Sequence, residues 1–102
     1  MRLFPWLHLL VGCSASYQTI TLRNRSPRAI EALYVYPVGA ADHGASRGAL
    51  ARDATLALKV KTGNVEVLAV GAKERVDDGQ SETKTASQVV ELRGPVELVF
   101  HD

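Results

Sequence analysis

The chain has 102 residues, which is enough for one domain and too short for two. Lys and Arg together number 12 and Asp and Glu number 11, so the formal net charge is +1. A surface this close to neutral has no electrostatic attraction for a polyphosphate, and we expect no nucleic-acid partner. Apolar residues make up 46% of the chain and charged residues 23%, a composition that excludes intrinsic disorder.

The N-terminal segment is apolar and short. Residues 3–12 carry no formal charge and follow a single Arg2. As a helix, ten residues span about 15 Å, against about 30 Å of bilayer hydrocarbon, so this segment is too short to cross a membrane. It has the length of the apolar region of an export signal, and we expect residues 1–12 to be a signal peptide.

The only cysteine of the chain, Cys13, follows this segment directly. Leu10-Val11-Gly12-Cys13 resembles the lipobox of bacterial lipoproteins, in which an aliphatic residue, a small or aliphatic residue and Gly or Ala precede the cysteine. The resemblance implies that the Cys13 thiol carries a diacylglyceryl group, with fatty acids such as palmitate. It also implies that signal peptidase II cuts before Cys13. Two or three acyl chains, each contributing about 0.8 kcal/mol per buried CH₂, anchor a protein stably to a membrane.

The expected location follows from the same resemblance. Ser14 stands where some envelope lipoproteins carry an Asp that retains them at the inner membrane, which implies an outer-membrane protein facing the periplasm. Residues 13–16 would then be the lipid-attachment site and a short tether. A lipidated cysteine also explains how an exported domain lacks a disulfide. Two alternatives stay open: a secreted protein without lipid, and a cytosolic protein in which residues 3–13 form a buried strand.

From residue 17 onward the chain carries the signals of β-strands. Apolar and polar residues alternate, or β-branched and aromatic residues cluster, in segments separated by Gly, Pro, Asn and Asp. One layer could not bury so many aliphatic side chains. The sequence therefore predicts an all-β fold over residues 17–102: a small antiparallel immunoglobulin-like β-sandwich of about six to seven strands. The expected strands cover residues 17–24, 29–38, 55–61, 65–72, 83–92 and 96–102.

Two local features of these strands are also predicted. Ile30, Leu33 and Val35 cannot all share one face of a regular strand, so a β-bulge is expected near Ala32. Thr62-Gly63-Asn64 has the residue types of a tight turn, and we expect it to join residues 55–61 and 65–72 as a hairpin.

A second resemblance covers about a third of the chain. The pattern Leu22-x-Asn24-x-Ser26, followed by a segment from Ile30 to Pro37 that contains Leu33-Tyr34-Val35, is similar to one found in small exported bacterial β-sandwich proteins of unknown function. The resemblance implies a sandwich fold and an exported location. It brings no enzymatic activity to this chain.

The titratable residues do not form a recognisable reactive site. The histidines, His8, His43 and His101, have no mutual spacing that suits a metal ion. Asp42 and His43 lie near Ser46 in a loop of small residues, which offers no third group to orient a catalytic base. We therefore expect neither an enzyme nor a cofactor or metal site.

The candidate binding residues lie at three places. Tyr34 and Tyr36 alternate with aliphatic residues and would make an exposed aromatic stripe, or else one would enter the core and the other cover an edge. Asp42 and His43 lie in the loop of residues 39–53. The third group surrounds the first turn and would contact anionic lipid or cell-wall polymers, or simply be a solvated turn. It consists of Arg23, Arg25 and Arg28.

These observations together predict a membrane-anchored envelope lipoprotein with a non-catalytic structural or binding role. Its partner would be the membrane, through the lipid, and an envelope protein or carbohydrate. Sheet edges and the loop of residues 39–53 are the expected contact surfaces, because unpaired strand edges accept further strands. The alternative is a cytosolic or secreted β-sandwich binding module without lipid.

Overall fold

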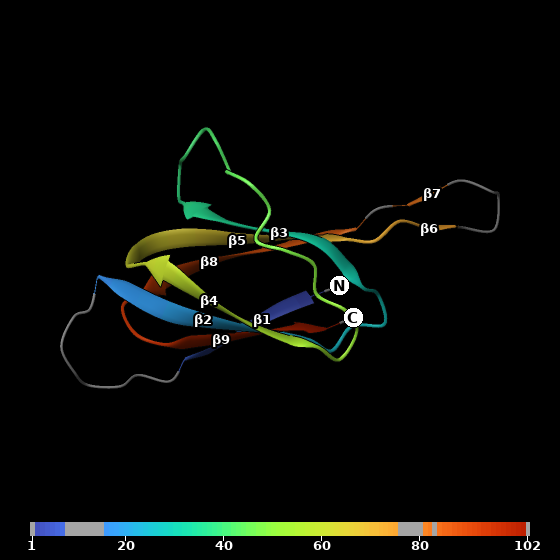
Figure 1. The fold of residues 1–102 in the computed structure, drawn as a ribbon, viewed down its shortest axis with the longest axis horizontal. Coiled ribbons are helices and arrows are strands. Elements are labelled where there is room, and N and C mark those ends of the chain that lie inside the picture. Colours follow the sequence, from blue (N-terminus) through green and yellow to red (C-terminus); the bar gives the residue numbers. More distant parts are fainter. Residues whose placement is uncertain (1, 8–15, 76–80, 83, 102) are drawn as a thin grey trace.

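The computed structural model describes residues 2–7, 16–75, 81–82 and 84–101, and within these ranges the regular structure is entirely β (Figure 1). This confirms the predicted all-β class. The strands are β1 (Arg2–Leu7), β2 (Tyr17–Asn24), β3 (Ile30–Pro37), β4 (Thr55–Lys61), β5 (Gly63–Gly71), β6 (Glu74–Arg75), β7 (Ser81–Glu82), β8 (Thr85–Leu92) and β9 (Val96–His101).

Two sheets pack face to face as a sandwich (Figure 1). We call the sheet with strand order β1-β9-β2-β4 sheet A, and the sheet with order β3-β5-β8 sheet B. The short pair β6-β7 projects from one end of the sandwich. Two sheets are needed because each strand exposes one apolar face that only a second layer buries.

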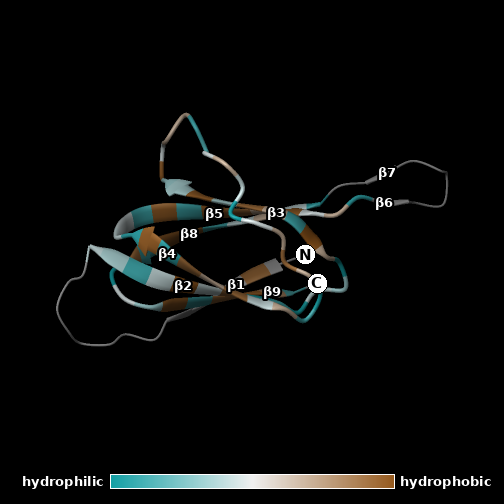
Figure 2. Ribbon diagram, viewed as in Figure 1, coloured by the Kyte–Doolittle hydropathy of each residue, from teal (hydrophilic) through white to brown (hydrophobic). Residues whose placement is uncertain are grey.

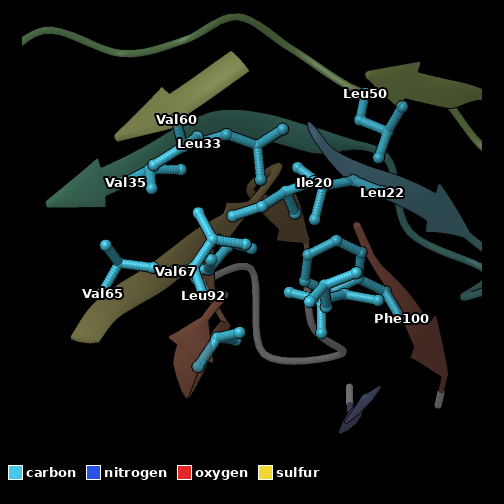
Figure 3. Packing of buried hydrophobic residues seen from close by; sticks show 14 of the residues in the cluster. Ile20, Leu22, Leu33, Val35, Leu50, Val60, Val65, Val67, Leu92 and Phe100 are labelled. Atoms are coloured by element: carbon cyan, nitrogen blue, oxygen red, sulfur yellow. The ribbon is translucent and has the colours of Figure 1, made fainter. Parts of the chain in front are cut away.

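The core lies between the two sheets and follows from the alternation along each strand (Figures 2 and 3). On β2, Ile20 and Leu22 are fully buried, while the alternate residues Thr19, Thr21 and Arg23 are only partly covered. Each such aliphatic side chain contributes about 1.5–3 kcal/mol on burial. The fully buried aliphatic and aromatic side chains of both sheets include Ile20, Leu22, Leu33, Val67, Leu92, Leu98 and Phe100.

The β-bulge predicted near Ala32 is confirmed. Between Ile30, opposite Gly71, and Ala32, opposite Val70, the pairing of β3 with β5 shifts by one residue. The extra residue reverses the phase of the alternation, so Ile30 and Leu33 both reach the core.

The hairpin predicted at Thr62-Gly63-Asn64 is wrong. β4 pairs with β2 in sheet A, whereas β5 pairs with β3 and β8 in sheet B. The chain therefore crosses from one sheet to the other at this point. Gly63 has a φ of 135°, a conformation that favours glycine, and a glycine between two alternating segments fits a crossing between sheets as well as a hairpin.

One strand pair departs from the antiparallel arrangement. β2 and β9 run parallel, with Ile20 opposite Val96 and Asn24 opposite Phe100. A parallel pair needs a long connection, and here nearly the whole domain lies between the two strands. The pairing places β2 and β9 side by side in the middle of sheet A.

The N-terminal segment continues sheet A in the full chain. Residues of β1 pair antiparallel with β9, from Arg2 opposite His101 to Leu7 opposite Val96, and Leu3 packs against the core. Pro5 fits an edge strand, which has a free side where no N–H is required. The lipobox residues Leu10, Val11, Gly12 and Cys13 lie outside the described residues, as does Ser14.

Candidate binding surfaces

The strand β2 defines two ends of the sandwich, which we call the Ser16 end and the Asn24 end. At the Ser16 end, the Thr62 N–H donates to the Ser16 carbonyl at 2.9 Å, and Tyr17 lies opposite Lys61. At the Asn24 end, the Asp53 N–H donates to the Asn24 carbonyl at 2.7 Å. β2 has eight residues, so about 23 Å separates its first and last Cα atoms.

Two of the three candidate arginines share a surface at the Asn24 end. Arg23 lies on the outer face of β2, and its Nε is 2.7 Å from the Oε1 of Glu97 on β9. Arg25 follows β2 and is exposed, and its N–H donates to the Phe100 carbonyl at 2.8 Å. Both arginines border a hollow of about 320 Å³, whose lining is Arg23, Arg25, Glu97, Val99 and His101.

The third arginine belongs to the interior. Arg28 is only 9% exposed, and its Nη1 donates to the Ala72 carbonyl at 3.1 Å. The aliphatic part of its side chain lies over Gly71, where an added Cβ would be 2.7 Å from Arg28 Cδ. Arg28 therefore fastens the turn of residues 25–28 to the end of β5, and it does not join the surface of Arg23 and Arg25.

A buried polar network that sequence reasoning did not predict holds this turn. The Asn24 Nδ2 donates to the carbonyls of Arg28 at 2.9 Å and Leu50 at 3.1 Å. The Asn24 Oδ1 accepts from the Ser26 N–H at 3.0 Å, and the Ser26 Oγ lies 2.7 Å away. An Asn at a strand end with Ser two residues later is typical of a side chain that bonds to nearby backbone groups. This pattern was the only sign of the network in the sequence.

The loop of residues 39–53 covers the outer edge of β3. Ile30 and Leu50 exchange two backbone hydrogen bonds of 2.9 Å, and the Arg47 N–H donates to the Leu33 carbonyl at 2.6 Å. The Ser46 Oγ accepts from the Leu33 N–H at 3.3 Å. Because this segment occupies the hydrogen-bonding groups of β3 there, that stretch of edge is closed to an incoming strand.

The same loop brings two candidate binding residues together. The rings of Tyr36 and His43 stack, with centroids 3.8 Å apart and planes 1° apart. Tyr36 is 6% exposed. Burial raises the pKa of the Tyr36 hydroxyl, and the hydrogen bond to Glu66 and its negative charge raise this pKa further.

The other two candidates of this region do not take part in the stack. The Asp42 Oδ1 accepts from the Gly44 N–H at 2.9 Å, which shapes the tip of the loop. Tyr34 is half-buried and lies opposite Leu68 in the pairing of β3 with β5. Tyr36 is therefore buried beneath the loop and does not form an exposed aromatic stripe with Tyr34.

Two further hollows lie at the Ser16 end, where the chain crosses between the sheets. They have volumes of about 250 Å³ and 320 Å³ and share Thr62, Gly63 and Asn64. Arg47 and Lys61 line the first, above the buried side chains of Val35, Val60 and Val65. Arg93 lines the second.

Within the part of the chain that the structure describes, no three His, Cys, Asp or Glu residues are grouped as metal ligands. In the same part, no helix has the length and apolar character that crossing a bilayer requires. No protein-family model matches the chain, and searches of curated proteins and of solved structures found no match either.

Proposed function

We propose that this chain is a lipid-anchored protein of the bacterial cell envelope whose β-sandwich is a binding module without catalytic activity. The observation that carries the proposal is the position of the only cysteine. Cys13 closes Leu10-Val11-Gly12-Cys13 and directly follows an apolar segment of signal-peptide length.

The start of the folded body supports this division of the chain. After Cys13, the first residue that the structure describes is Ser16, whose carbonyl accepts from the Thr62 N–H, and β2 starts at the next residue. A cut before Cys13 would therefore leave β2 and every later strand complete. The lipid would be attached three residues ahead of Ser16, which is bonded to the sandwich through Thr62.

The hollow at the Asn24 end is the surface that we propose for the partner. It combines the guanidinium groups of Arg23 and Arg25 with the carboxylate of Glu97 and the imidazole of His101. Charged and planar donor groups around a shallow hollow suit the hydroxyls and acid groups of a carbohydrate or the polar side chains of a protein. The buried Asn24 network fixes the turn that carries Arg25, so this surface is preorganised.

Removal of residues 1–12 would change sheet A. β1 pairs with β9 over six residues in the full chain, so cutting before Cys13 would make β9 an edge strand. The Phe100 carbonyl accepts from the Arg25 N–H, on the side of β9 that faces β2. Alternate residues of a strand direct their backbone groups to opposite sides, so those of Glu97 and Val99 point to the side that β1 occupies. The backbone groups of Glu97 and Val99 would then face solvent and be open to an added strand.

The pairing of β1 with β9 also favours a second candidate function. If residues 2–7 remain in the mature protein, they complete sheet A and place Leu3 against the core. The chain would then be a β-sandwich binding module without lipid, secreted or cytosolic. In this case the binding surface is the same hollow, and Cys13 is an ordinary thiol.

Metabolic labelling with palmitate separates the two candidates. We expect label in the wild-type protein and none after Cys13→Ala, together with a mature N-terminus at Cys13 by mass spectrometry. Ser14→Ala is the matched control and should retain the label. Detection of intact residues 1–12 in protein isolated from the envelope would overturn the proposed function and leave the second candidate.

A further inference from the structure

The Ser16 end is the part of the sandwich that a lipid at Cys13 would hold nearest to the bilayer. Three peptide units separate Cys13 from Ser16, and a chain of this length reaches at most about 11 Å. Ser16 is itself fastened to the sheet crossing, because its carbonyl accepts from both the N–H and the Oγ1 of Thr62. The Asn24 end lies about 23 Å farther along β2.

Several exposed residues of the Ser16 end are of the kinds that suit a bilayer surface. Tyr17 is 59% exposed and lies opposite the exposed Lys61. Val38 is 50% exposed, and its N–H donates to the Asn64 carbonyl at 3.0 Å. Amphipathic aromatic rings and cations are enriched at the level of lipid headgroups, where a ring contacts acyl chains and a cation contacts phosphate.

The cations of this end border its two hollows. Lys61 lines the one with an apolar floor, and Arg93 lines the other. The Arg93 Nη2 lies 2.6 Å from the Glu91 Oε1, but both side chains are mostly exposed, at 78% and 61%. An exposed ion pair of this kind contributes little to stability, so it opposes a contact between Arg93 and a phosphate only weakly.

We infer that the Ser16 end is a membrane-contact face for anionic phospholipid. The face consists of Tyr17, Val38, Lys61, Thr62, Gly63, Asn64 and Arg93. Lys61 and Arg93 contact headgroup phosphates, and the Tyr17 ring lies at the depth of the headgroups. The inference rests on the proposed function, because the lipid at Cys13 brings this face to the bilayer. With the Ser16 end on the bilayer, the hollow of Arg23 and Arg25 faces away from the membrane, toward a partner.

The chain offers a direct test, because its single tryptophan, Trp6, lies in the predicted signal peptide. In the mature protein, a tryptophan introduced at one position is the sole emitter. Tyr17→Trp reports on the membrane-contact face, and Arg52→Trp is the matched control in an exposed turn at the Asn24 end. Each lipidated variant is isolated from the envelope and reconstituted in vesicles of phosphatidylcholine and phosphatidylglycerol that contain headgroup-level spin-labelled lipid.

Quenching of the Tyr17→Trp variant should be at least about threefold stronger than that of Arg52→Trp, because about 23 Å separates the two ends. Equal quenching at both positions, or stronger quenching of Arg52→Trp, overturns the inference. Lipidated protein with this result leaves the proposed function intact. Wild-type protein from the envelope that emits tryptophan fluorescence and carries no acyl chain shows that residue 6 was retained, and both proposals then fail.

Charge reversal tests the contribution of the cations. In the Tyr17→Trp background, Lys61→Glu with Arg93→Glu should remove at least about half of the quenching in vesicles that contain phosphatidylglycerol. Arg25→Glu with Arg52→Glu is the matched pair at the other end and should leave the quenching unchanged. An equal loss from both pairs would show a general charge effect and overturn the assigned face.

Discussion

The two ends of the sandwich are held by different means. At the Asn24 end, buried polar side chains hold the turn after β2, and the side chain of Asn24 alone bonds to three other residues. At the Ser16 end, backbone bonds hold the sheet crossing, and the side chains of Tyr17, Lys61 and Arg93 are exposed. The fold therefore depends on the identity of buried polar side chains at the Asn24 end and mainly on backbone bonds at the Ser16 end.

The largest expected loss of stability follows from Asn24→Ala. The substitution removes two bonds to carbonyls and leaves the buried Ser26 N–H without its acceptor. We expect a loss of about 3 kcal/mol, or a fall in Tm of roughly 12–24 °C, in thermal unfolding followed by circular dichroism. Asn64→Ala, at an exposed position of the Ser16 end, should change the free energy of unfolding by less than about 0.5 kcal/mol. Equal effects would remove the contrast between the ends.

Two glycines give a second comparison of the ends. A Cβ at Gly71 would lie 2.7 Å from Arg28 Cδ and 3.1 Å from the Lys84 carbonyl oxygen. Arg28 must then move and lose its bond to the Ala72 carbonyl, so Gly71→Ala should destabilise by about 1–2 kcal/mol. A Cβ at Gly94, in the turn between β8 and β9, meets nothing within 4 Å. Gly94→Ala should be neutral or stabilise by up to about 0.5 kcal/mol in urea unfolding, and a loss there would contradict the comparison.

The raised pKa of Tyr36 predicts a pH dependence of stability. The folded state holds the Tyr36 proton more tightly than the unfolded state, whose hydroxyl titrates near pH 10. The contribution of this group is therefore complete below about pH 10 and is lost as the pH rises toward the folded-state pKa. In urea unfolding above pH 9.5, Tyr36→Phe should lose stability less steeply than the wild type. Tyr34→Phe is the control. If Tyr34→Phe reduces the pH dependence of the free energy of unfolding as much as Tyr36→Phe does, the effect does not belong to Tyr36.

Local patterns were sufficient to predict the six long strands from β2 to β5 and from β8 to β9, but not their partners, and they did not predict β6 and β7. Alternation placed β2 and β4 at their observed bounds, and the phase change at Ala32 predicted the bulge. These signals depend only on residues a few positions apart. The parallel pairing of β2 with β9 and the assignment of β4 and β5 to different sheets depend on contacts between distant segments, for which alternation carries no information.

The sequence predicted the candidate binding residues but not which of them lie together. Arg23 and Arg25 share a surface, but Arg28 lies in the interior, where Gly71 leaves room for its side chain. Spacing along one turn could not reveal this, because the packing partner lies more than 40 residues away. The stacking of Tyr36 on His43 likewise depends on how the loop of residues 39–53 folds back over β3.

The smallest expected effect is that of His43→Ala. The stack covers Tyr36 near the Ser16 end, and an aromatic pair contributes about 0.5–1.5 kcal/mol beyond its buried area. Because His43 itself is exposed and backbone bonds hold the loop, we expect a loss at the lower limit, about 0.5 kcal/mol, in thermal unfolding. His43→Phe keeps a flat ring and should retain wild-type stability. If it is instead as unstable as His43→Ala, the imidazole nitrogens and not the stack hold the loop, and the Ser16 end depends on specific polar side chains as the Asn24 end does.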